Sequence, residues 1–274
     1  MCSQMAYLRP DRLEDAIAAL AHGPAVPLAG GTDFYPARVA HMPAERVLDL
    51  TAISSLRGIA RDGASVRIGA LATWTDLLQA DLPPIMDGLK LAAREVGGPQ
   101  VQNAGTLAGN ICNASPAADG IPPLLALDAE VELAGPRGTR RLAVDEFVLG
   151  NRRTARAEEE LVTAIVVPLP NGQARSAFLK LGARKYLVIS IVMVAASICR
   201  DASGAIARVR ISVGAAGPRA QRLPAAEAAV LRGEPVVAGH LAPLAPITDI
   251  RGTDAYRHDA ALTLVRRAVD ALLA

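Results

Sequence analysis

The spacing of apolar and polar residues predicts a chain of short helices and strands up to about residue 172. Helices are expected where apolar residues recur at helical spacing or follow a capping residue, over 13–20, 73–79, 84–95 and 121–127. Short apolar or alternating runs predict strands over 25–29, 46–50, 56–60, 65–70, 130–133, 139–143 and 161–167. Pro170-Asn171-Gly172 then marks a turn or a domain boundary.

The pattern changes after residue 174. Longer apolar runs over 176–181, 189–199 and 205–213 predict antiparallel strands, and helices are expected over 225–231 and 260–273. This part of the chain is therefore predicted to form a second domain of antiparallel sheet plus helices. The whole is an α+β protein.

Residues 97–120 follow neither a helical nor a strand period. Gly97, Gly98, Gly105 and Gly109 permit unusual backbone angles and close approach, and the Asn, Thr, Ser and Asp residues between them favour turns. Apolar segments on both sides predict an ordered loop anchored to a core. The exposed N–H groups of such a loop suit a ligand that carries phosphates.

A second glycine pair, Gly30-Gly31, follows the strand predicted at 25–29 and precedes Thr32-Asp33 and a helix expected over 34–40. A strand, a glycine turn and a helix N-terminus together form a layout that can cradle a phosphate. The third glycine of the dinucleotide fingerprint and the Lys of a P-loop are missing. A tight turn packed on a sheet is therefore the alternative interpretation.

Composition narrows the class of protein. Apolar residues make up 51% of the chain, which is enough for a large core. The net charge of +2 comes from positive and negative side chains interspersed along the chain, so nucleic acid is disfavoured as a partner. Cys2, Cys112 and Cys199 lie too far apart for a disulfide framework or a metal motif. The first residues do not resemble a signal peptide, and the apolar segment 187–199 is too short to span a bilayer. A soluble cytoplasmic protein without a transmembrane segment is expected.

The remaining candidates leave alternatives open. Asp119 could accept hydrogen bonds from a ribityl or ribose hydroxyl, or could cap the helix over 121–127. Lys180, in an apolar strand, either reaches solvent or meets an anionic ligand. Tyr186 is either a surface residue or a ring-stacking one, and Cys112 is expected to fill apolar space. The sequence shows two glycine loops but no group of side chains suited to acid–base catalysis. It therefore favours redox chemistry carried by a cofactor.

Three segments now carry a family resemblance: Ala29-Gly30-Gly31-Thr32-Asp33, residues 103–110 (Asn-Ala-Gly-Thr-Leu-Ala-Gly-Asn) and residues 114–119 (Ala-Ser-Pro-Ala-Ala-Asp). They resemble the FAD-binding medium subunit of molybdenum hydroxylases, the family of the xanthine dehydrogenase and carbon monoxide dehydrogenase flavoproteins. The resemblance implies a p-cresol methylhydroxylase (PCMH)-type FAD-binding fold over residues 1–172. It divides this fold into two α/β subdomains, about 1–57 and 58–172, and implies a small C-terminal domain over 173–274.

The resemblance also implies FAD-binding residues. Two loops would bind the FAD pyrophosphate through backbone amides, and Asn113 and Asp119 would bind polar parts of the cofactor. Val96 occupies a position that is aromatic in some relatives, Val162 and Lys180 match positions near the flavin and its adenine-bearing half, and Tyr186 could lie against the isoalloxazine ring. The loop residues are Pro27, Leu28, Ala29, Gly30, Gly31, Thr32, Asp33 and Phe34 in the first and Thr106, Leu107, Ala108, Gly109 and Asn110 in the second.

The family's reaction implies partners. Substrate is hydroxylated at a molybdenum cofactor in a large subunit, and electrons pass through [2Fe–2S] clusters of a small subunit to FAD, in an assembly of the (αβγ)n type. Residues 183–188 lack the acidic residues found in NAD-using relatives, so a quinone, oxygen or a protein is at least as plausible an acceptor as NAD. A stand-alone FAD oxidoreductase of the same fold and a flavin-free scaffold subunit are the alternatives.

Overall fold

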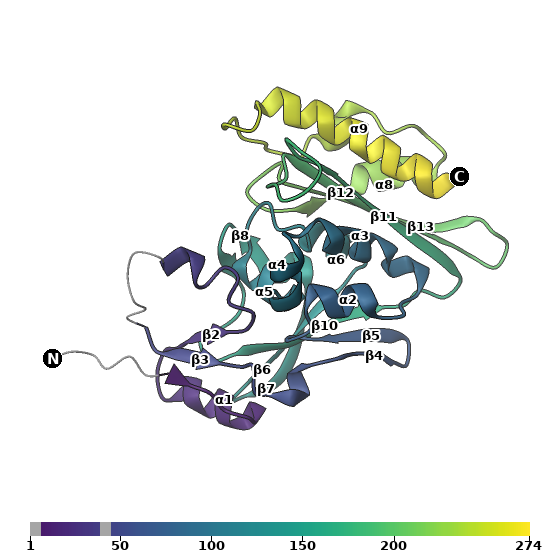
Figure 1. Cartoon of the computed structure of the whole chain (residues 1–274). Helices are drawn as coiled ribbons and strands as arrows, with labels where there is room; N and C mark the ends of the chain where they lie inside the picture. The colour runs from purple at the N-terminus through teal and green to yellow at the C-terminus, as the bar shows by residue number, and fades with distance from the viewer. Residues whose placement is uncertain (1–6, 39–44) are drawn as a thin grey trace.

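A computed structural model describes residues 7–38 and 45–274 of the chain. Its sheets and helices stack in layers, with a small sheet at one side (Figure 1). The helices are α1 (Leu13–Ala21), α2 (Trp74–Gln79), α3 (Asp87–Glu95), α4 (Pro99–Ala104), α5 (Leu107–Asn113), α6 (Ile121–Ala126), α7 (Val144–Phe147), α8 (Pro224–Leu231) and α9 (Asp254–Leu273). Short 3-10 turns are η1 (Pro36–Arg38), η2 (Ser54–Leu56), η3 (Pro84–Met86) and η4 (Ala238–Leu241).

The N-terminal part contains two sheets. Parallel strands in the order β1-β3-β2 form the small sheet, and antiparallel strands in the order β4-β5-β10-β6-β7 form a larger one. Their bounds are β1 (Tyr7–Leu8), β2 (Val26–Leu28), β3 (Val47–Asp49), β4 (Ile59–Asp62), β5 (Ser65–Gly69), β6 (Glu130–Gly135), β7 (Gly138–Ala143) and β10 (Leu161–Pro168). A separate two-stranded ribbon pairs β8 (Val148–Gly150) with β9 (Arg153–Thr154).

The position of each strand follows from its residues. Strand β10 is apolar over almost its whole length and is buried on both faces, so it takes the middle of the five-stranded sheet. Strand β7 carries Arg140 and Arg141 and is largely exposed at the edge. Charged side chains on an edge strand disfavour pairing with another chain.

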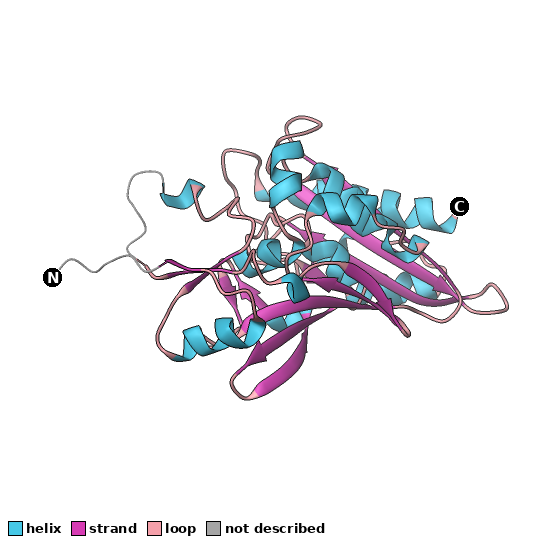
Figure 2. Cartoon of the chain, turned by 60° about the horizontal axis from the view of Figure 1, so that its bottom comes forward, coloured by secondary structure: helices cyan, strands magenta, loops and turns pink. Residues whose placement is uncertain are grey.

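The C-terminal part is a four-stranded antiparallel sheet in the order β11-β12-β13-β14. Its strands are β11 (Gln173–Leu181), β12 (Val192–Arg200), β13 (Ile206–Gly214) and β14 (Gln221–Arg222). Helices α8 and α9 cover its outer face, and helices that include α3 and α6 lie between it and the five-stranded sheet (Figures 1 and 2). Because both faces are covered, the apolar residues of β12 are all buried.

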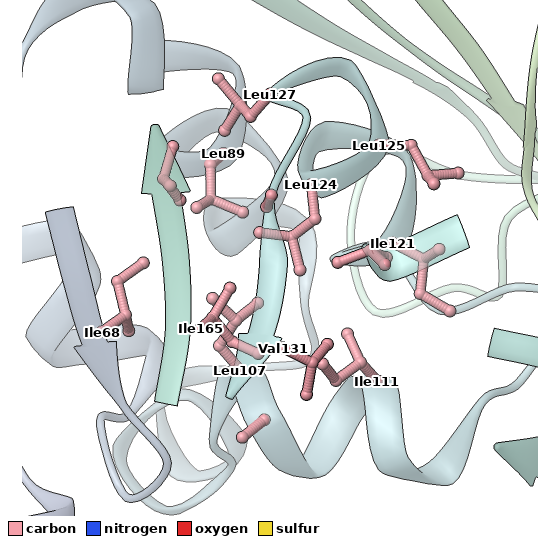
Figure 3. Packing of buried hydrophobic residues seen from close by; sticks show 14 of the residues in the cluster. Ile68, Leu89, Leu107, Ile111, Ile121, Leu124, Leu125, Leu127, Val131 and Ile165 are labelled. Carbon is pink, nitrogen blue, oxygen red and sulfur yellow. The ribbon is translucent and has the colours of Figure 1, made fainter. Parts of the chain in front are cut away.

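A main core fills the space between the five-stranded sheet and the helices above it. Ile68, Val131 and Ile165 project from β5, β6 and β10 toward Leu89 of α3 and Leu124 of α6 (Figure 3). A second core lies between the C-terminal sheet and α8 and α9. This arrangement confirms the expected α+β class.

Two local predictions were wrong. Residues 97–120 are not one loop, since they contain α4 and α5; Pro99 sits in the first turn of α4 and Thr106 caps α5 through its side chain. A helix over 34–40 is not observed either, because turns and η1 occupy 34–38, while residues 39 and 40 lie outside the described part of the chain. The Pro at the start of α4 and the Thr106 cap of α5 are helix-start signals that outweigh the glycine-rich composition of residues 97–120.

Asp128 links the two parts of the chain. It follows α6 with a left-handed backbone (φ 50°), and its carboxylate accepts hydrogen bonds from Arg208 (3.2 Å) and Arg210 (2.9 Å) of β13 and from Arg222 (3.1 Å) of β14. All of these side chains are less than one third exposed. The cluster therefore ties the turn between α6 and β6 to β13 and β14 of the four-stranded sheet.

We predict that Asp128→Asn lowers the free energy of unfolding by about 2 kcal/mol, because guanidinium groups lose their charged acceptor while the amide still tolerates the left-handed backbone. Chemical denaturation followed by circular dichroism measures this. Glu234→Gln is the matched control, since its pair with Arg232 is exposed and should have no measurable effect. Equal stability of the two variants would contradict the prediction.

Candidate functional site

A cleft of about 600 Å³ opens between the small parallel sheet and the α4–α5 segment. Its walls are the end of β2 with residues 29–34, the α5 helix, and residues near the β8–β9 ribbon. The two glycine segments singled out in the sequence are thus brought together across one cleft, although more than 60 residues separate them in the chain.

The first wall depends on Gly30 and Gly31. A Cβ on Gly30 would lie 1.8 Å from the carbonyl oxygen of Ala104, so the two backbones touch where no side chain fits. Gly31 has φ +71°, a conformation that L residues rarely adopt. The N–H groups of residues 30–34 find no acceptor among the described residues, which leaves a row of donors beside the cleft.

The second wall begins at Thr106. Its hydroxyl accepts the N–H of Gly109 (2.9 Å) and so starts α5, while Leu107 donates to the carbonyl of Ala72 (3.3 Å). In the described part of the chain the N–H groups of Thr106 and Ala108 have no acceptor. These unpaired donors at the start of a helix lie on the same cleft as the first loop.

Trp74 supports the second wall at the turn between α4 and α5. It is 2% exposed, and a Cβ on Gly105 would lie 3.4 Å from its ring. Its N–H donates to the carbonyl of Gly105 (3.1 Å). The turn between α4 and α5 is therefore fixed by a buried ring and by main-chain bonds.

Most of the residues proposed from the sequence line this cleft. They are Pro27, Leu28, Ala29, Gly30, Gly31, Thr32, Asp33, Phe34, Val96, Thr106, Ala108, Gly109, Asn110, Asn113 and Val162.

The structure places the other proposed residues away from the cleft lining. Leu107 is buried in the main core, because it faces away from the cleft on α5. Tyr186 is 55% exposed on the segment between β11 and β12. Asp119 does not cap α6, whose N-cap is Gly120 without a side-chain bond.

Asp119 and Lys180 bind each other. The Lys180 Nζ lies 2.8 Å from the Asp119 Oδ2, with the two side chains 5% and 10% exposed, and the Ser190 hydroxyl donates to Oδ1 (2.7 Å). Burial raises the pKa of the Asp119 carboxyl, while Lys180 and Ser190 act in the opposite direction. Of the alternatives left open for Lys180, contact with an anion is the one observed, but the anion belongs to the chain itself.

Sequence reasoning missed several cleft residues. Arg38 stacks 4.0 Å from the Phe34 ring centroid, Arg152 donates to the Asn113 side chain (3.2 Å), and Arg156 donates to the carbonyl of Glu160 (2.7 Å). Arg152 and Arg156 lie beside the two short strands of the β8–β9 ribbon. No motif marks them, because only the fold brings the β8–β9 ribbon against α5.

Cys112 also lies in the cleft and is not the apolar filler that was expected. Its side chain is exposed to the cleft, while the surrounding protein raises the pKa of its thiol to about 11 by desolvation. Desolvation disfavours the thiolate, which is the nucleophilic form of a cysteine.

The cleft suits an anionic ligand. It is surrounded by unpaired main-chain N–H groups on two walls and by the guanidinium groups of Arg38, Arg152 and Arg156. Asp33 is the one carboxylate among its described lining residues. Apolar side chains such as Val101 and Leu161 complete the lining. A phosphate-bearing ligand with rings fits this combination. Among residues 7–38 and 45–274, no group of His, Cys, Asp or Glu side chains is placed to hold a metal ion.

Comparison with known families identifies this ligand. The family model for the FAD-binding domain in molybdopterin dehydrogenase matches residues 3–170, and that for the carbon monoxide dehydrogenase flavoprotein C-terminal domain matches residues 177–272. The first covers more than half of the chain. The cleft lies in this first region, and FAD is the cofactor of the family.

Individual relatives agree. The chain is 36% identical to a putative xanthine dehydrogenase FAD-binding subunit of Escherichia coli K12, over 81% of this chain and 77% of that protein. It is 35% identical to the carbon monoxide dehydrogenase medium chain of Afipia carboxidovorans, over 96% and 95% respectively. The solved carbon monoxide dehydrogenase of Hydrogenophaga pseudoflava, a form lacking the Mo-pyranopterin moiety, superposes with a TM-score of 0.88 at 31% identity, covering 100% of this chain and 98% of that one.

We predict that Gly30→Ala destabilises the chain by at least about 2 kcal/mol, because the new methyl group would collide with the Ala104 backbone. Thermal unfolding measures the change. Gly239→Ala is the control, since its Cβ would meet nothing within 4 Å and its φ is ordinary. A Gly30→Ala chain that unfolds at the temperature of the unsubstituted protein would show that the two cleft walls do not depend on this contact.

The fold, the cleft and the comparisons lead to the same assignment. The two family regions follow one another as the FAD-binding part and the antiparallel C-terminal part do in the structure. The relatives named above are subunits of dehydrogenases. The chain therefore belongs to the family of FAD-binding subunits of molybdopterin dehydrogenases, which are oxidoreductases.

Proposed function

We propose that the chain is the electron-transferring FAD subunit of a molybdenum hydroxylase, which accepts electrons from [2Fe–2S] clusters of a partner subunit and passes them to an external acceptor. One observation carries the proposal. The similarity to a carbon monoxide dehydrogenase medium chain runs over 95% of that relative's length, so it concerns one whole subunit type of that enzyme. A further relative is named as a subunit of a dehydrogenase complex.

The residues of the cleft fit FAD. The unpaired N–H groups of residues 30–34 and of Thr106 and Ala108 would hold the pyrophosphate, and Arg38 or Arg152 would offset its charge. Val96 and Val162 would pack against ring surfaces, and Asn113 would bind a polar part of the cofactor. When bound, FAD supplies the oxidation–reduction chemistry. The protein positions it and limits its contact with water.

The proposal includes partners. A large subunit would carry the molybdenum cofactor and a small subunit the [2Fe–2S] clusters, in an (αβγ)n assembly. Relatives are named for xanthine, nicotinate, carbon monoxide and nicotine, so these compounds are the first substrates to test.

The acceptor and the location are part of the same proposal. Residues 183–188 contain no acidic side chain, which supports a quinone, oxygen or a protein as acceptor rather than NAD. A cytoplasmic location is supported by the free thiols of Cys112 and Cys199. No helix among residues 7–38 and 45–274 is long and apolar enough to cross a membrane.

We predict that Thr32→Asp weakens FAD binding by about 100-fold, because a new carboxylate beside the row of unpaired N–H groups would repel the pyrophosphate. Thr32→Asn has nearly the same shape without the charge and should bind within about threefold of the unsubstituted chain. Fluorescence titration of the FAD-free chain measures both dissociation constants. Equal affinities of the two variants would remove the first loop from the pyrophosphate site.

Electron transfer is tested on the complex purified through a tag on this chain. We expect FAD, iron and molybdenum to co-purify, and substrate from the set above to reduce the flavin only while the partner subunits are present. The isolated FAD-loaded chain should not oxidise these substrates. Turnover by the isolated chain would instead establish a stand-alone oxidoreductase, and a chain that takes up no FAD would favour a scaffold subunit.

A further inference from the structure

We propose that the groove lined by β4 and β11, where the two parts of the chain meet, binds an acidic, extended segment of a partner polypeptide. The groove has a volume of about 530 Å³ and shares no described lining residue with the cofactor cleft. Its lining includes Arg61 of β4, Arg175 of β11 and apolar residues such as Pro84 and Leu169. It is therefore a separate surface feature of the chain.

The charge of the groove is positive and uncompensated. Arg61 and Arg175 are both exposed, and in the described part of the chain neither guanidinium group has a hydrogen-bond acceptor or an acidic partner. The described lining contains no Asp or Glu side chain. By contrast, Arg67 on the adjacent strand β5 pairs with Glu132 at 2.8 Å. Two unpaired cations without a carboxylate in the same groove complement the carboxylates of a partner.

Both strands that carry these arginines are sheet edges. β4 is the outermost strand of the five-stranded sheet and β11 that of the four-stranded sheet, so each has one edge without a strand partner among the described residues. Unpaired main-chain N–H and C=O groups on a strand edge can pair with an added strand. An extended polypeptide can therefore combine main-chain pairing with carboxylate contacts, whereas a compact anion such as phosphate cannot.

Contacts between the two parts of the chain fix the shape of the groove. The hydroxyl of Ser176 on β11 donates to the carbonyl of Ile85 (2.6 Å), which also lines the groove. Gly172 has φ +100°, and an added Cβ would lie 2.3 Å from the carbonyl oxygen of Arg200, so the turn before β11 passes close to the end of β12. A groove that is fixed in advance loses less conformational entropy when a partner binds.

These features define the segment that fits. It is extended, carries carboxylates that reach Arg61 and Arg175, and places an apolar side chain against Pro84 and Leu169. The inference rests on the proposed function for the source of this segment, which is a partner subunit of the same complex. Because the groove and the cofactor cleft share no described lining residue, a subunit docked in the groove leaves the FAD contacts unchanged.

Binding of the purified partner subunits to the full FAD-loaded chain tests the inference. We expect Arg61→Glu and Arg175→Glu each to raise the dissociation constant at least about fivefold at about 0.05 M salt, because a carboxylate in the groove would repel the acidic segment. At about 1 M salt the difference from the unsubstituted chain should fall below about twofold, since exposed charges are then screened. Biolayer interferometry measures these constants.

Arg267→Glu is the matched control. Arg267 is exposed on α9, has no acidic partner among the described residues and lies outside the groove. The same change in net charge at this position should therefore alter the dissociation constant by less than about twofold. An unchanged FAD content and circular dichroism spectrum show that each variant is folded.

Cross-linking locates the segment directly. A zero-length carbodiimide joins an amine to a carboxylate in contact with it, and Arg61→Lys and Arg175→Lys supply such an amine without changing the charge of the groove. In the assembled complex we expect each of these variants to form a new link to an Asp or Glu of a partner subunit. Mass spectrometry of the digested complex identifies the linked peptides.

Equal dissociation constants for Arg61→Glu, Arg175→Glu and Arg267→Glu would overturn the inference and leave the electron-transfer proposal standing. So would the absence of new links to a partner subunit, or links that reach only a second copy of this chain, since the groove would then serve self-association. A chain that takes up FAD but binds no partner subunit would overturn both proposals. The failure of this inference alone can therefore be distinguished from the failure of the proposed function.

Discussion

The close approach of Gly30 to the carbonyl of Ala104 is the contact on which the cofactor site depends. It lets the loop after β2 lie against the turn between α4 and α5, so that a parallel sheet and a helical segment far apart in the chain form two walls of one cleft. Any side chain at this position would separate the walls. The unpaired N–H groups of residues 30–34 then face the same space as the start of α5, and neither wall alone would surround an anion in this way.

A second constraint is the joining of two sheets through a helical layer. Helices α3 and α6 pack against the five-stranded sheet and also against β11, β12 and β13, with Phe178 and Met193 filling the contact. The Asp128 cluster adds charged hydrogen bonds at one end of this contact, and the Asp119 pair adds a buried one near the cleft. Val96, which directly follows α3, lines the cofactor cleft, whereas the C-terminal sheet contributes none of the described lining residues.

The composition of the cleft lining agrees with an electron-transfer role. The cleft offers main-chain donors and apolar walls, and its charged groups are mostly guanidinium groups suited to phosphates. Such a site binds and orients a redox cofactor without taking part in proton transfer at a substrate.

The sequence by itself determined the α+β class, most elements, the family and the segments that line the cleft. Apolar spacing and turn residues are local signals, and the glycine motifs are contiguous, so all of these can be read along the chain. The sequence did not reveal α4 and α5, whose caps outweigh a glycine-rich composition. Nor did it place Arg152 in the cleft or pair Asp119 with Lys180 and Ser190. Only the tertiary structure decided these side-chain contacts, because a partner 39 or more residues away depends on how sheets and helices pack, and no local pattern encodes that packing.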